Sequence, residues 1–320
     1  MLLLSYLRES RQQAIEGLRK RNLKDAEGMV SEVIRLDDER KQTQTQLDKI
    51  KANINTRSRE IGELMKSKQN DQANRLREEV AGWKTEVKTL EDKLALLESD
   101  LRISLYKIPN VPAASVPAGK SAEDNIVAYQ HGAIPVLPEG SLPHWELIKK
   151  YDIIDFDLGV KISGAGFPVY KGKGAKLQRA LINFFLDEAA KAGYAEVMPP
   201  IVVNEASGYG TGQLPDKEGQ MYFIPQDGLY LIPTAEVPIT NLYRDVIVTE
   251  AELPVKNVGY TPCFRREAGS WGAHVRGLNR LHQFDKVEIV QITRPEDSYR
   301  VLDEMCAHVQ GLLEKLELPY

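Results

Sequence analysis

The sequence predicts an α+β protein in two parts. Residues 1–108 form an antiparallel two-helix coiled-coil arm, and residues 109–320 form a body built on an antiparallel sheet flanked by helices. Three observations predict this: apolar residues recur at the coiled-coil period through the first hundred positions, prolines cluster after residue 108, and two strand-like segments flank a glycine-rich loop near residue 270. A length of 320 residues fits two domains of roughly 100–200 residues each.

The seam of the arm is a repeat of alternating four- and three-residue steps. Eight of the eleven such positions from Met29 to Leu64 are apolar, and so are all eight positions from Leu76 to Leu101. This spacing is the 3.5-residue period of a coiled coil, and no proline interrupts it before Pro109. The polar break over residues 65–75 is short enough for the second helix to fold back antiparallel on the first.

Basic side chains gather around the expected tip of the arm. They are Arg57, Arg59, Lys66, Lys68, Arg75 and Arg77. Residues 1–108 hold 22 lysines and arginines against 19 acids, so the net charge of −4 combines a basic arm with an acidic body. A solvated helix face, dimerisation through the seam and contact with RNA phosphates all remain open explanations of the basic tip.

The start of the body reads as a linker followed by a helix. Pro109 and the prolines after it end the arm and place a domain boundary near residue 108. The glycines at 164–174 complete no phosphate-binding motif. Apolar spacing predicts a helix over residues 175–192 with Gly193 as its stop. Residues 196–203 read as a strand interrupted by prolines, which favours a sheet edge or an interface.

The cysteines argue for a reducing compartment. Cys263 and Cys306 lie far apart in the sequence, and neither belongs to a group with metal-ligand spacing, so the sequence identifies no metal site. No run of residues approaches the roughly 18 apolar positions of a membrane span. We therefore expect a cytoplasmic protein that has no membrane partner.

Three segments of the body carry groups suited to chemistry. Thr234 and Glu236 would share one side of an extended chain. Residues 263–267 and 280–288 read as two antiparallel strands around the glycine-rich loop, and Phe284 and Glu288 would then face the same side about 13 Å apart. Taken singly, these residues also fit blander explanations: a cross-strand ion pair for Arg265 with Glu267, core packing for Phe284, and a turn between prolines for Thr234 and Glu236.

Together these segments resemble a known family. Phe264-Arg265-x-Glu267, a loop, and then Arg280-x-x-x-Phe284-x-x-x-Glu288 resemble motif 2 of the class II aminoacyl-tRNA synthetases, and the helix over 175–192 with Pro199 resembles their motif 1. The triplet TAE at 234–236, GTGQLP at 210–215, REAGS at 266–270 and HQFDKVE at 282–288 resemble the seryl-tRNA synthetases in particular. The N-terminal hairpin is similar to the tRNA-binding arm of that family.

The resemblance implies a serine–tRNA ligase. Such an enzyme activates L-serine with ATP and Mg²⁺ to seryl-adenylate and transfers serine to tRNA(Ser), or also to tRNA(Sec), with release of AMP and diphosphate. It implies a homodimer formed through the motif 1 region. The alternative is a non-catalytic coiled-coil tRNA-binding protein, or a paralogue, that retains the synthetase scaffold.

The resemblance also assigns site residues. Arg265 and Glu267 would be catalytic, and the ATP-binding set would be Arg265, Arg266, Glu267, Leu281, His282, Gln283 and Phe284. The serine-binding set would be Thr234, Ala235, Glu236 and Glu288, and the basic residues of the arm tip would contact tRNA. An arginine at the α-phosphate would neutralise the charge that grows as the substrate carboxylate attacks.

The family's chain continues past residue 320. Motif 3 and the acidic residues that hold magnesium are expected beyond that point, so we expect a truncated or partial sequence or, as a weaker alternative, a shortened paralogue. Because motif 3 is absent from residues 1–320, we expect this 320-residue form alone to show little or no activity.

Overall fold

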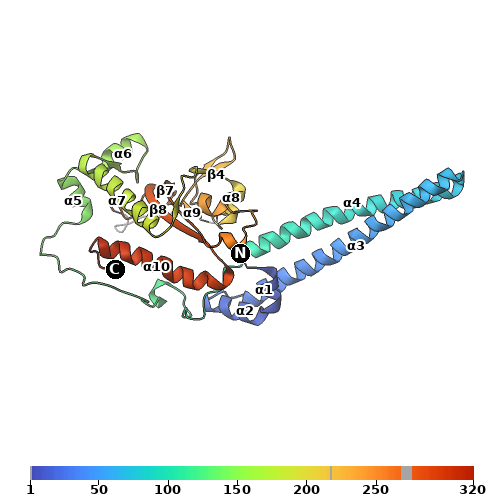
Figure 1. Cartoon of the computed structure of the whole chain (residues 1–320), viewed down its shortest axis with the longest axis horizontal. Coiled ribbons are helices and arrows are strands. Elements are labelled where there is room, and N and C mark those ends of the chain that lie inside the picture. The colour runs from blue at the N-terminus through green and yellow to red at the C-terminus, as the bar shows by residue number, and fades with distance from the viewer. Residues whose placement is uncertain (1, 217, 268–275) are drawn as a thin grey trace. The chain divides into compact units, whose positions relative to one another are not determined.

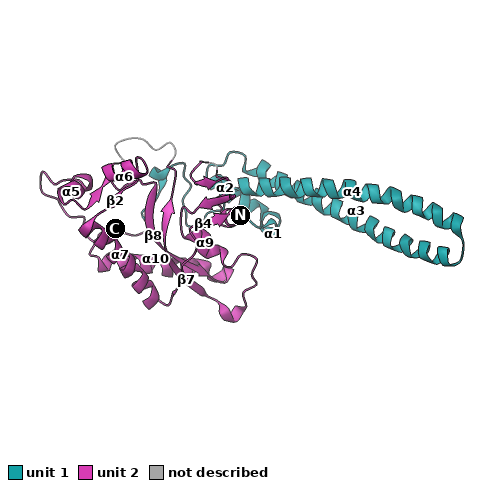
Figure 2. Cartoon of the chain, turned by 90° about the horizontal axis from the view of Figure 1, so that it is seen from above, with its two compact units in different colours: residues 1–128 teal, residues 129–320 magenta. Residues whose placement is uncertain are grey.

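The structure is a computed structural model that describes residues 2–216, 218–267 and 276–320. It divides into two compact units, Met1–Ala128 and Tyr129–Tyr320, which are coloured separately in Figure 2. Helices and antiparallel strands are both present, as the α+β prediction requires. No helix in the described ranges is long and apolar enough to cross a membrane. Residues 268–275, most of the predicted glycine-rich loop, lie outside the described residues.

The first unit is dominated by a long helical hairpin (Figure 1). Its helices are α1 (Leu4–Glu9), α2 (Arg11–Lys20), α3 (Ala26–Lys66) and α4 (Asn70–Lys107), followed by a short 3₁₀ helix η1 (Ala122–Asp124). At 1.5 Å per residue, the 41 residues of α3 are about 60 Å long. The chain reverses over residues 67–69, where Lys68 takes a φ of +61°. The predicted hairpin is confirmed.

The hairpin is held by the predicted seam. Every seam position in α3 and α4 is buried or half-buried, and the buried ones include Val33, Leu36, Leu47, Val80, Leu97 and Leu101. The seam is densest at the base of the hairpin, where residues of α3 and α4 share one core with Leu7 of α1 and Leu18 of α2. The sequence pattern did not reveal that the first twenty residues form two separate short helices.

The base of the hairpin also contains a buried carboxylate. The Asp37 side chain is fully buried and accepts hydrogen bonds from Arg8 (3.0 Å) and Arg40 (2.9 Å), and Lys41 forms an ion pair with it at 2.8 Å. Desolvation opposes ionisation of this carboxyl, but the hydrogen bonds from Lys41, Arg40 and Arg8 outweigh it and lower the pKa of Asp37 to about 2. Because Arg8 belongs to α1 and Asp37 to α3, their hydrogen bond joins the two helices.

We expect Asp37→Asn to lower the free energy of unfolding by about 2 kcal/mol, since three charge-assisted contacts are weakened. The folded-state pKa of about 2 lies below the unfolded value of about 3.9. Stability from Asp37 is therefore full above roughly pH 4 and is lost as the pH falls toward 2. Urea unfolding of both proteins between pH 2 and 6 should show their difference shrinking at low pH. Asp48→Asn, at an exposed carboxylate of α3 that accepts from Gln44, is the control, and an equal loss there would contradict the assignment.

The described part of the second unit contains three small sheets with helices around them (Figure 1). Its strands are β1 (Ile154–Asp155), β2 (Val169–Tyr170), β3 (Ala195–Glu196), β4 (Val202–Asn204), β5 (Phe223–Ile224), β6 (Leu229–Leu231), β7 (Val255–Phe264) and β8 (Gln283–Ile292). Its helices are α5 (His144–Lys150), α6 (Phe156–Ile162), α7 (Gly172–Lys191), α8 (Glu205–Gly210), α9 (Glu236–Asn241) and α10 (Ser298–Lys315), with 3₁₀ helices η2 (Glu250–Glu252) and η4 (Pro295–Asp297). The sheet orders are β1-β2, β3-β7-β8 and β4-β6-β5.

The ten-residue strands β7 and β8 form the antiparallel pair that the sequence predicts, with Phe264 opposite Gln283 and Gly259 opposite Glu288. The predicted bounds are wrong: residues 265–267 and 280–282 lie outside the strands, which extend away from the loop to Val255 and Ile292. One face of the pair packs on α7, because Ala189 lies in one core with Val258 and Val287. Val290 on the other face packs with Ala235 and Ile239 at α9. Since side chains alternate along a strand, Phe284, Lys286 and Glu288 share the α9 face with Val290.

We expected a single strand, interrupted by prolines, over residues 196–203, and this prediction is wrong. The segment splits into β3, which pairs in parallel with β7 at the edge of its sheet, and β4, which belongs to another sheet. Pro199 and Pro200 lie between the two strands and cannot donate to a ladder, so the chain leaves one sheet there and enters the next. The predicted helix begins three residues earlier than expected, at Gly172, and Gly193 follows it with a φ of +85°.

Candidate active site

The start of α9 brings the TAE triplet against β8. Residues 234–236 are not extended: Ala235 has helical angles (φ −64°, ψ −18°), and Glu236 is the first residue of α9. The prediction of a shared side on an extended chain is therefore wrong. The Thr234 hydroxyl instead accepts the backbone N–H of Glu236 at 3.2 Å, which satisfies one free donor of the helix start. Gly259 of β7 allows α9 to pack closely on the sheet, because a Cβ at this position would lie 2.8 Å from Ile239 Cδ1 of α9.

Thr234, Lys286 and Glu288 form one hydrogen-bonded cluster. The Thr234 hydroxyl donates to Glu288 Oε2 at 2.8 Å, and Lys286 Nζ lies 2.5 Å from the same oxygen. Lys286 Nζ also donates to Thr234 Oγ1 at 3.0 Å. Thr234 is buried, whereas about a fifth of the Glu288 side chain (20%) and a third of the Lys286 side chain (35%) remain exposed. The cluster is therefore open to a ligand on one side.

Glu236 adds a second carboxylate beside this cluster. The residue is exposed, yet desolvation of its carboxyl and then the nearby Glu288 carboxylate raise its pKa, and Lys286 partly offsets them. Two carboxylates thus face one lysine, which gives the site one net negative charge when both are ionised. A small molecule that carries an ammonium group complements such a site.

The other end of the same strand face carries Arg265 and Phe284. The Arg265 guanidinium lies over the Phe284 ring, 5.0 Å from its centroid. The backbone N–H of Arg265 donates to the His282 carbonyl at 2.9 Å, which fixes the residue just beyond the last paired position of β7. Phe284 is half-buried. A forked cation beside an exposed aromatic face suits a phosphate joined to a flat base.

Arg266 and Glu267 continue from Arg265 toward the loop. The Arg266 N–H donates to the Gln220 carbonyl at 2.8 Å. Glu267 takes a left-handed φ of +47°, a conformation that is costly for a residue with a side chain. Its largely buried carboxylate pairs with Arg280 Nε at 2.6 Å. The ion pair of Glu267 is thus with Arg280, and it closes the base of the loop between β7 and β8.

Four of the residues predicted to bind ATP, those at positions 281–284, divide into two groups. Leu281 is buried, and the His282 ring packs inside the protein, stacked on Phe167 with centroids 5.2 Å apart. His282 Nδ1 lies 3.0 Å from the Arg265 carbonyl and 3.1 Å from the Tyr222 hydroxyl. Gly166 is required beside it, since its φ is +84° and a Cβ would lie 2.3 Å from His282 Cδ2. Gln283 is exposed and Phe284 is half-buried, and both line the cavity described next, which Leu281 and His282 do not.

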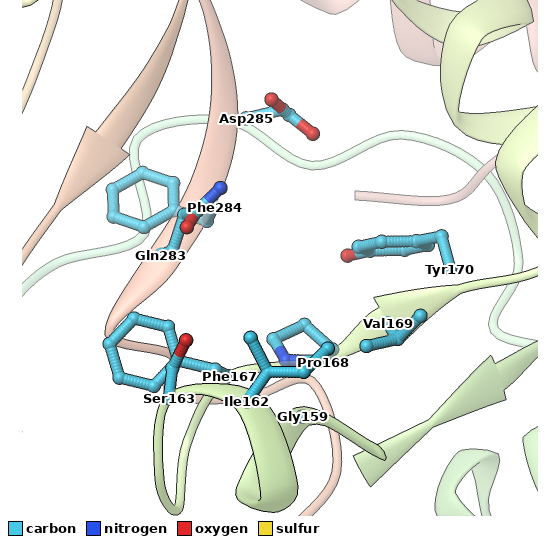
Figure 3. A pocket seen from close by; sticks show the side chains of 10 residues that line it. All are labelled: Gly159, Ile162, Ser163, Phe167, Pro168, Val169, Tyr170, Gln283, Phe284 and Asp285. Atoms are coloured by element: carbon cyan, nitrogen blue, oxygen red, sulfur yellow. The ribbon is translucent and has the colours of Figure 1, made fainter.

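A cavity of about 210 Å³ adjoins Gln283 and Phe284 (Figure 3). Figure 3 shows Phe284 and Asp285 leaving β8 toward opposite sides, with Asp285 on the side of Tyr170. Asp285 accepts hydrogen bonds from Tyr260 (2.7 Å) and Gln178 (2.8 Å). The cavity is lined by Gly159, Ile162, Ser163, Phe167, Pro168, Val169, Tyr170, Gln283, Phe284 and Asp285. The Phe284 ring that faces Arg265 is therefore on the strand side away from Tyr170.

Sequence reasoning assigned no role to Lys286, although it lies in the HQFDKVE segment. The available signal was its place in the alternation: it stands two residues from both Phe284 and Glu288 and so shares their face. Its contact with Thr234 was hidden, because that residue is 52 positions away in the sequence.

A magnesium site does not fit the described residues. Among them, no group of three or more His, Cys, Asp or Glu side chains is placed to hold a metal ion. Magnesium in nucleotide enzymes is commonly held by one or two carboxylates together with the substrate's phosphates, and the residues described here supply no such set on their own.

The antiparallel pair β7–β8, with an arginine and aromatic at one end of a face and a threonine–carboxylate cluster at the other, is the core of a class II aminoacyl-tRNA synthetase. Residues 222–320 match the family model described as "tRNA synthetase class II core domain (G, H, P, S and T)", and residues 1–112 match "Seryl-tRNA synthetase N-terminal domain". The serine–tRNA ligase of Salinibacter ruber is 42% identical over 320 residues, covering 100% of this chain and 74% of the relative. The chain belongs to the seryl-tRNA synthetase family.

Other relatives agree with this assignment. The serine–tRNA ligase of Chlorobium chlorochromatii is 44% identical, covering 100% of this chain and 75% of that protein. The crystal structure of seryl-tRNA synthetase from Pyrococcus horikoshii complexed with ATP matches with a TM-score of 0.87 at 28% identity, covering 100% of this chain and 76% of that one. The cytoplasmic serine–tRNA ligase of Naegleria fowleri in complex with AMP matches with a TM-score of 0.81 at 25% identity, with coverages of 100% and 77%.

Proposed function

We propose that this protein is a serine–tRNA ligase that uses the α9 face of β8 as its active site. A carboxylate oxygen of L-serine attacks the α-phosphorus of ATP, the bond to the diphosphate oxygen breaks, and seryl-adenylate forms. A ribose hydroxyl of tRNA(Ser) then attacks the seryl carbonyl, and AMP leaves. A tRNA(Sec) is a second acceptor under the same proposal.

One observation carries this proposal. Phe284, Lys286 and Glu288 lie on one face of β8, where Arg265 contacts Phe284 and Thr234 contacts Lys286 and Glu288, and Phe284 and Glu288 are about 13 Å apart. That length is of the order of an aminoacyl adenylate, whose two ends need an ammonium site and a base site. The seryl-tRNA synthetases of P. horikoshii and N. fowleri, which were solved with ATP and AMP, support nucleotide binding at this fold.

Each predicted residue has a role in this arrangement. Arg265 neutralises the α-phosphate as charge develops there, with Glu267 and Arg266 holding the loop base beside it. Phe284 receives the adenine, Gln283 borders it, and Leu281 and His282 support both from within the protein. Thr234, Glu236 and Glu288 bind the ammonium and hydroxyl groups of serine, and Ala235 sets the helix turn between two of them. If alanine or glycine bound in place of serine, polar groups of the site would be left unpaired, and the site therefore binds these two amino acids less tightly.

Further features complete the proposal. Mg²⁺ would be the cofactor that neutralises the phosphates of ATP, and the described residues supply no set of carboxylates that would hold it on their own. A second copy of the chain packs against α7 and the segment that ends in Pro199 and Pro200, which gives a homodimer. The same proposal assigns the enzyme to the cytoplasm, one compartment in which tRNA, ATP and serine are all present.

Amino-acid-dependent exchange between diphosphate and ATP tests the proposal. We expect the full-length gene product to catalyse exchange with serine and none with threonine, proline or alanine. Exchange driven by a different amino acid would show that the specificity is wrong. The absence of exchange with any amino acid, together with retained tRNA binding, would favour a non-catalytic tRNA-binding protein on a synthetase scaffold.

The tip of the hairpin is proposed to bind tRNA through its phosphates. Lys66, Lys68 and Arg75 are exposed around the turn at residues 67–69, whereas Arg57 is half-buried in the seam, where it pairs with Glu60 at 2.6 Å. The contribution of Arg57 to tRNA binding is therefore the smallest of the set, and Arg59 and Arg77 complete it. The basic tip supplies salt-dependent affinity without reading sequence.

Reversing Lys66, Lys68 and Arg75 to glutamate should raise the KM for tRNA(Ser) at least tenfold, since three phosphate contacts become repulsive. The diphosphate exchange rate should stay within twofold, because the first step involves no tRNA. Charging assays at 50 and 200 mM salt provide the measurement, and the salt dependence of the variant should be shallower. Equal loss of exchange and charging would indicate misfolding instead.

A further inference from the structure

Lys286 contacts two of the residues proposed to bind serine, and neither the sequence resemblance nor the relatives assign it a role. We propose that Lys286 is a positioning residue that holds Thr234 and Glu288 in the single arrangement that receives the amino acid, an inference that rests on the proposed function. It acts on the substrate through these two side chains.

The first argument is the hydrogen-bonding capacity of the Thr234 hydroxyl. A hydroxyl has one proton to donate and two lone pairs to accept with. Lys286 Nζ donates to it at 3.0 Å and the Glu236 N–H donates to it at 3.2 Å, so both lone pairs are used. Its proton must then point to Glu288 Oε2, 2.8 Å away. Lys286 thereby fixes the direction in which Thr234 donates.

The second argument is the choice of oxygen on Glu288. Thr234 and Lys286 both contact Oε2, so they leave Oε1 as the oxygen that they do not touch. When two donors bind one oxygen of a carboxylate, the orientation of the carboxylate plane is fixed, and its other oxygen points in a fixed direction. Without Lys286, the Glu288 side chain regains rotamers that a ligand must then restrict.

The third argument is charge. Glu236 and Glu288 approach closely enough for Glu288 to raise the pKa of Glu236, after the larger effect of desolvation, and Lys286 opposes this. With Lys286 the two carboxylates carry one uncompensated charge, which matches one substrate ammonium. Without it they repel each other directly, and one moves away or takes up a proton.

The position of Lys286 in the sheet suits this role. It pairs across the ladder with Thr261, a small residue that is 1% exposed. About a third of its side chain (35%) is exposed. The position of the Lys286 ammonium is therefore fixed by its contacts with Thr234 and Glu288 rather than by burial.

Kinetics of diphosphate exchange with Lys286→Met, Lys286→Arg and Lys256→Met test the inference. Lys256 lies on β7 with its ammonium over the Tyr194 ring, outside the proposed site, and serves as the matched control. We expect Lys286→Met to raise the KM for serine about tenfold or more, with kcat and the KM for ATP within about threefold of the unchanged protein. Lys286→Arg should recover most of the loss, and Lys256→Met should change none of these constants.

Two outcomes would overturn the inference. A large fall in kcat with an unchanged KM for serine would mean that Lys286 acts on the reacting groups themselves. An unchanged KM for serine in Lys286→Met, with a folded protein by circular dichroism, would mean that Lys286 positions nothing. Exchange by the unchanged protein with another amino acid would refute the proposed specificity alone, and the same comparison run with that amino acid would still decide the role of Lys286.

Discussion

Replacing Arg265 by alanine should lower the rate of serine-dependent diphosphate exchange about a thousandfold. The reason is electrostatic: the α-phosphate gains charge as the serine carboxylate attacks, and a preorganised cation next to it stabilises that charge more in the transition state than in the ground state. Arg265 is held for this task by its N–H bond to the His282 carbonyl and by the Phe284 ring beneath its guanidinium. The loss should appear mainly in kcat.

Two further variants sharpen this experiment. Arg265→Lys keeps a charge but loses the planar fork, so we expect an intermediate loss of roughly ten- to a hundredfold. Arg300→Ala removes an exposed arginine of α10 that pairs with Asp297 and Glu304, and it should leave exchange unchanged. A fall in Arg265→Ala that is confined to the KM for ATP would show a role in ground-state binding instead.

The second large effect is expected for Glu288. In Glu288→Gln the side chain keeps its shape but loses its charge, so it no longer attracts the serine ammonium and leaves Lys286 without its ion-pair partner. We expect the KM for serine to rise about a hundredfold, which is the scale of a lost charge-assisted hydrogen bond in a partly desolvated site. The KM for ATP should change little, because the nucleotide end of the strand is untouched.

The control for this variant is Glu304→Gln on α10, where an exposed carboxylate pairs with Arg300. It should leave both Michaelis constants unchanged. Isothermal titration of serine, with and without a non-hydrolysable ATP analogue, would separate binding from chemistry. If Glu288→Gln instead impaired ATP and serine equally, Glu288 would be a structural residue of the sheet, and the assignment of a serine site would be contradicted.

The arm shows which parts of the fold are readable from sequence. Its seam repeats over many heptads, so each position reinforces the same interpretation, and burial follows it from Met29 to Leu101. The β7–β8 pair was readable for a similar reason, since two alternating segments flank one loop. Short elements were not: residues 196–203 divide between two sheets, and α1 and α2 have too few turns for a periodic signal.

The candidate site divides in the same way. Arg265, Phe284 and Glu288 were assigned through the resemblance of their segments to motif 2, and the four-residue spacing of Phe284 and Glu288 places both on one face of β8. The geometry of Thr234 and Glu236 was misjudged, since two alternating polar residues between prolines look extended, and it is packing of Ala235 and Ile239 on β8 that starts a helix there. His282 was placed at the ATP site by its motif, but its ring turns inward onto Phe167.

By itself the sequence determined the helical hairpin, the central pair of strands and the family to which the chain belongs, because periodicity and motif spacing are properties of neighbouring residues. Several contacts were decided only by the tertiary structure. Lys286 binds Thr234 and Glu288, and Glu267 pairs with Arg280. Asp37 pairs with Arg8 at the base of the arm. These contacts join side chains from different elements, and their strength depends on burial and distance. Neither quantity exists until the chain has folded.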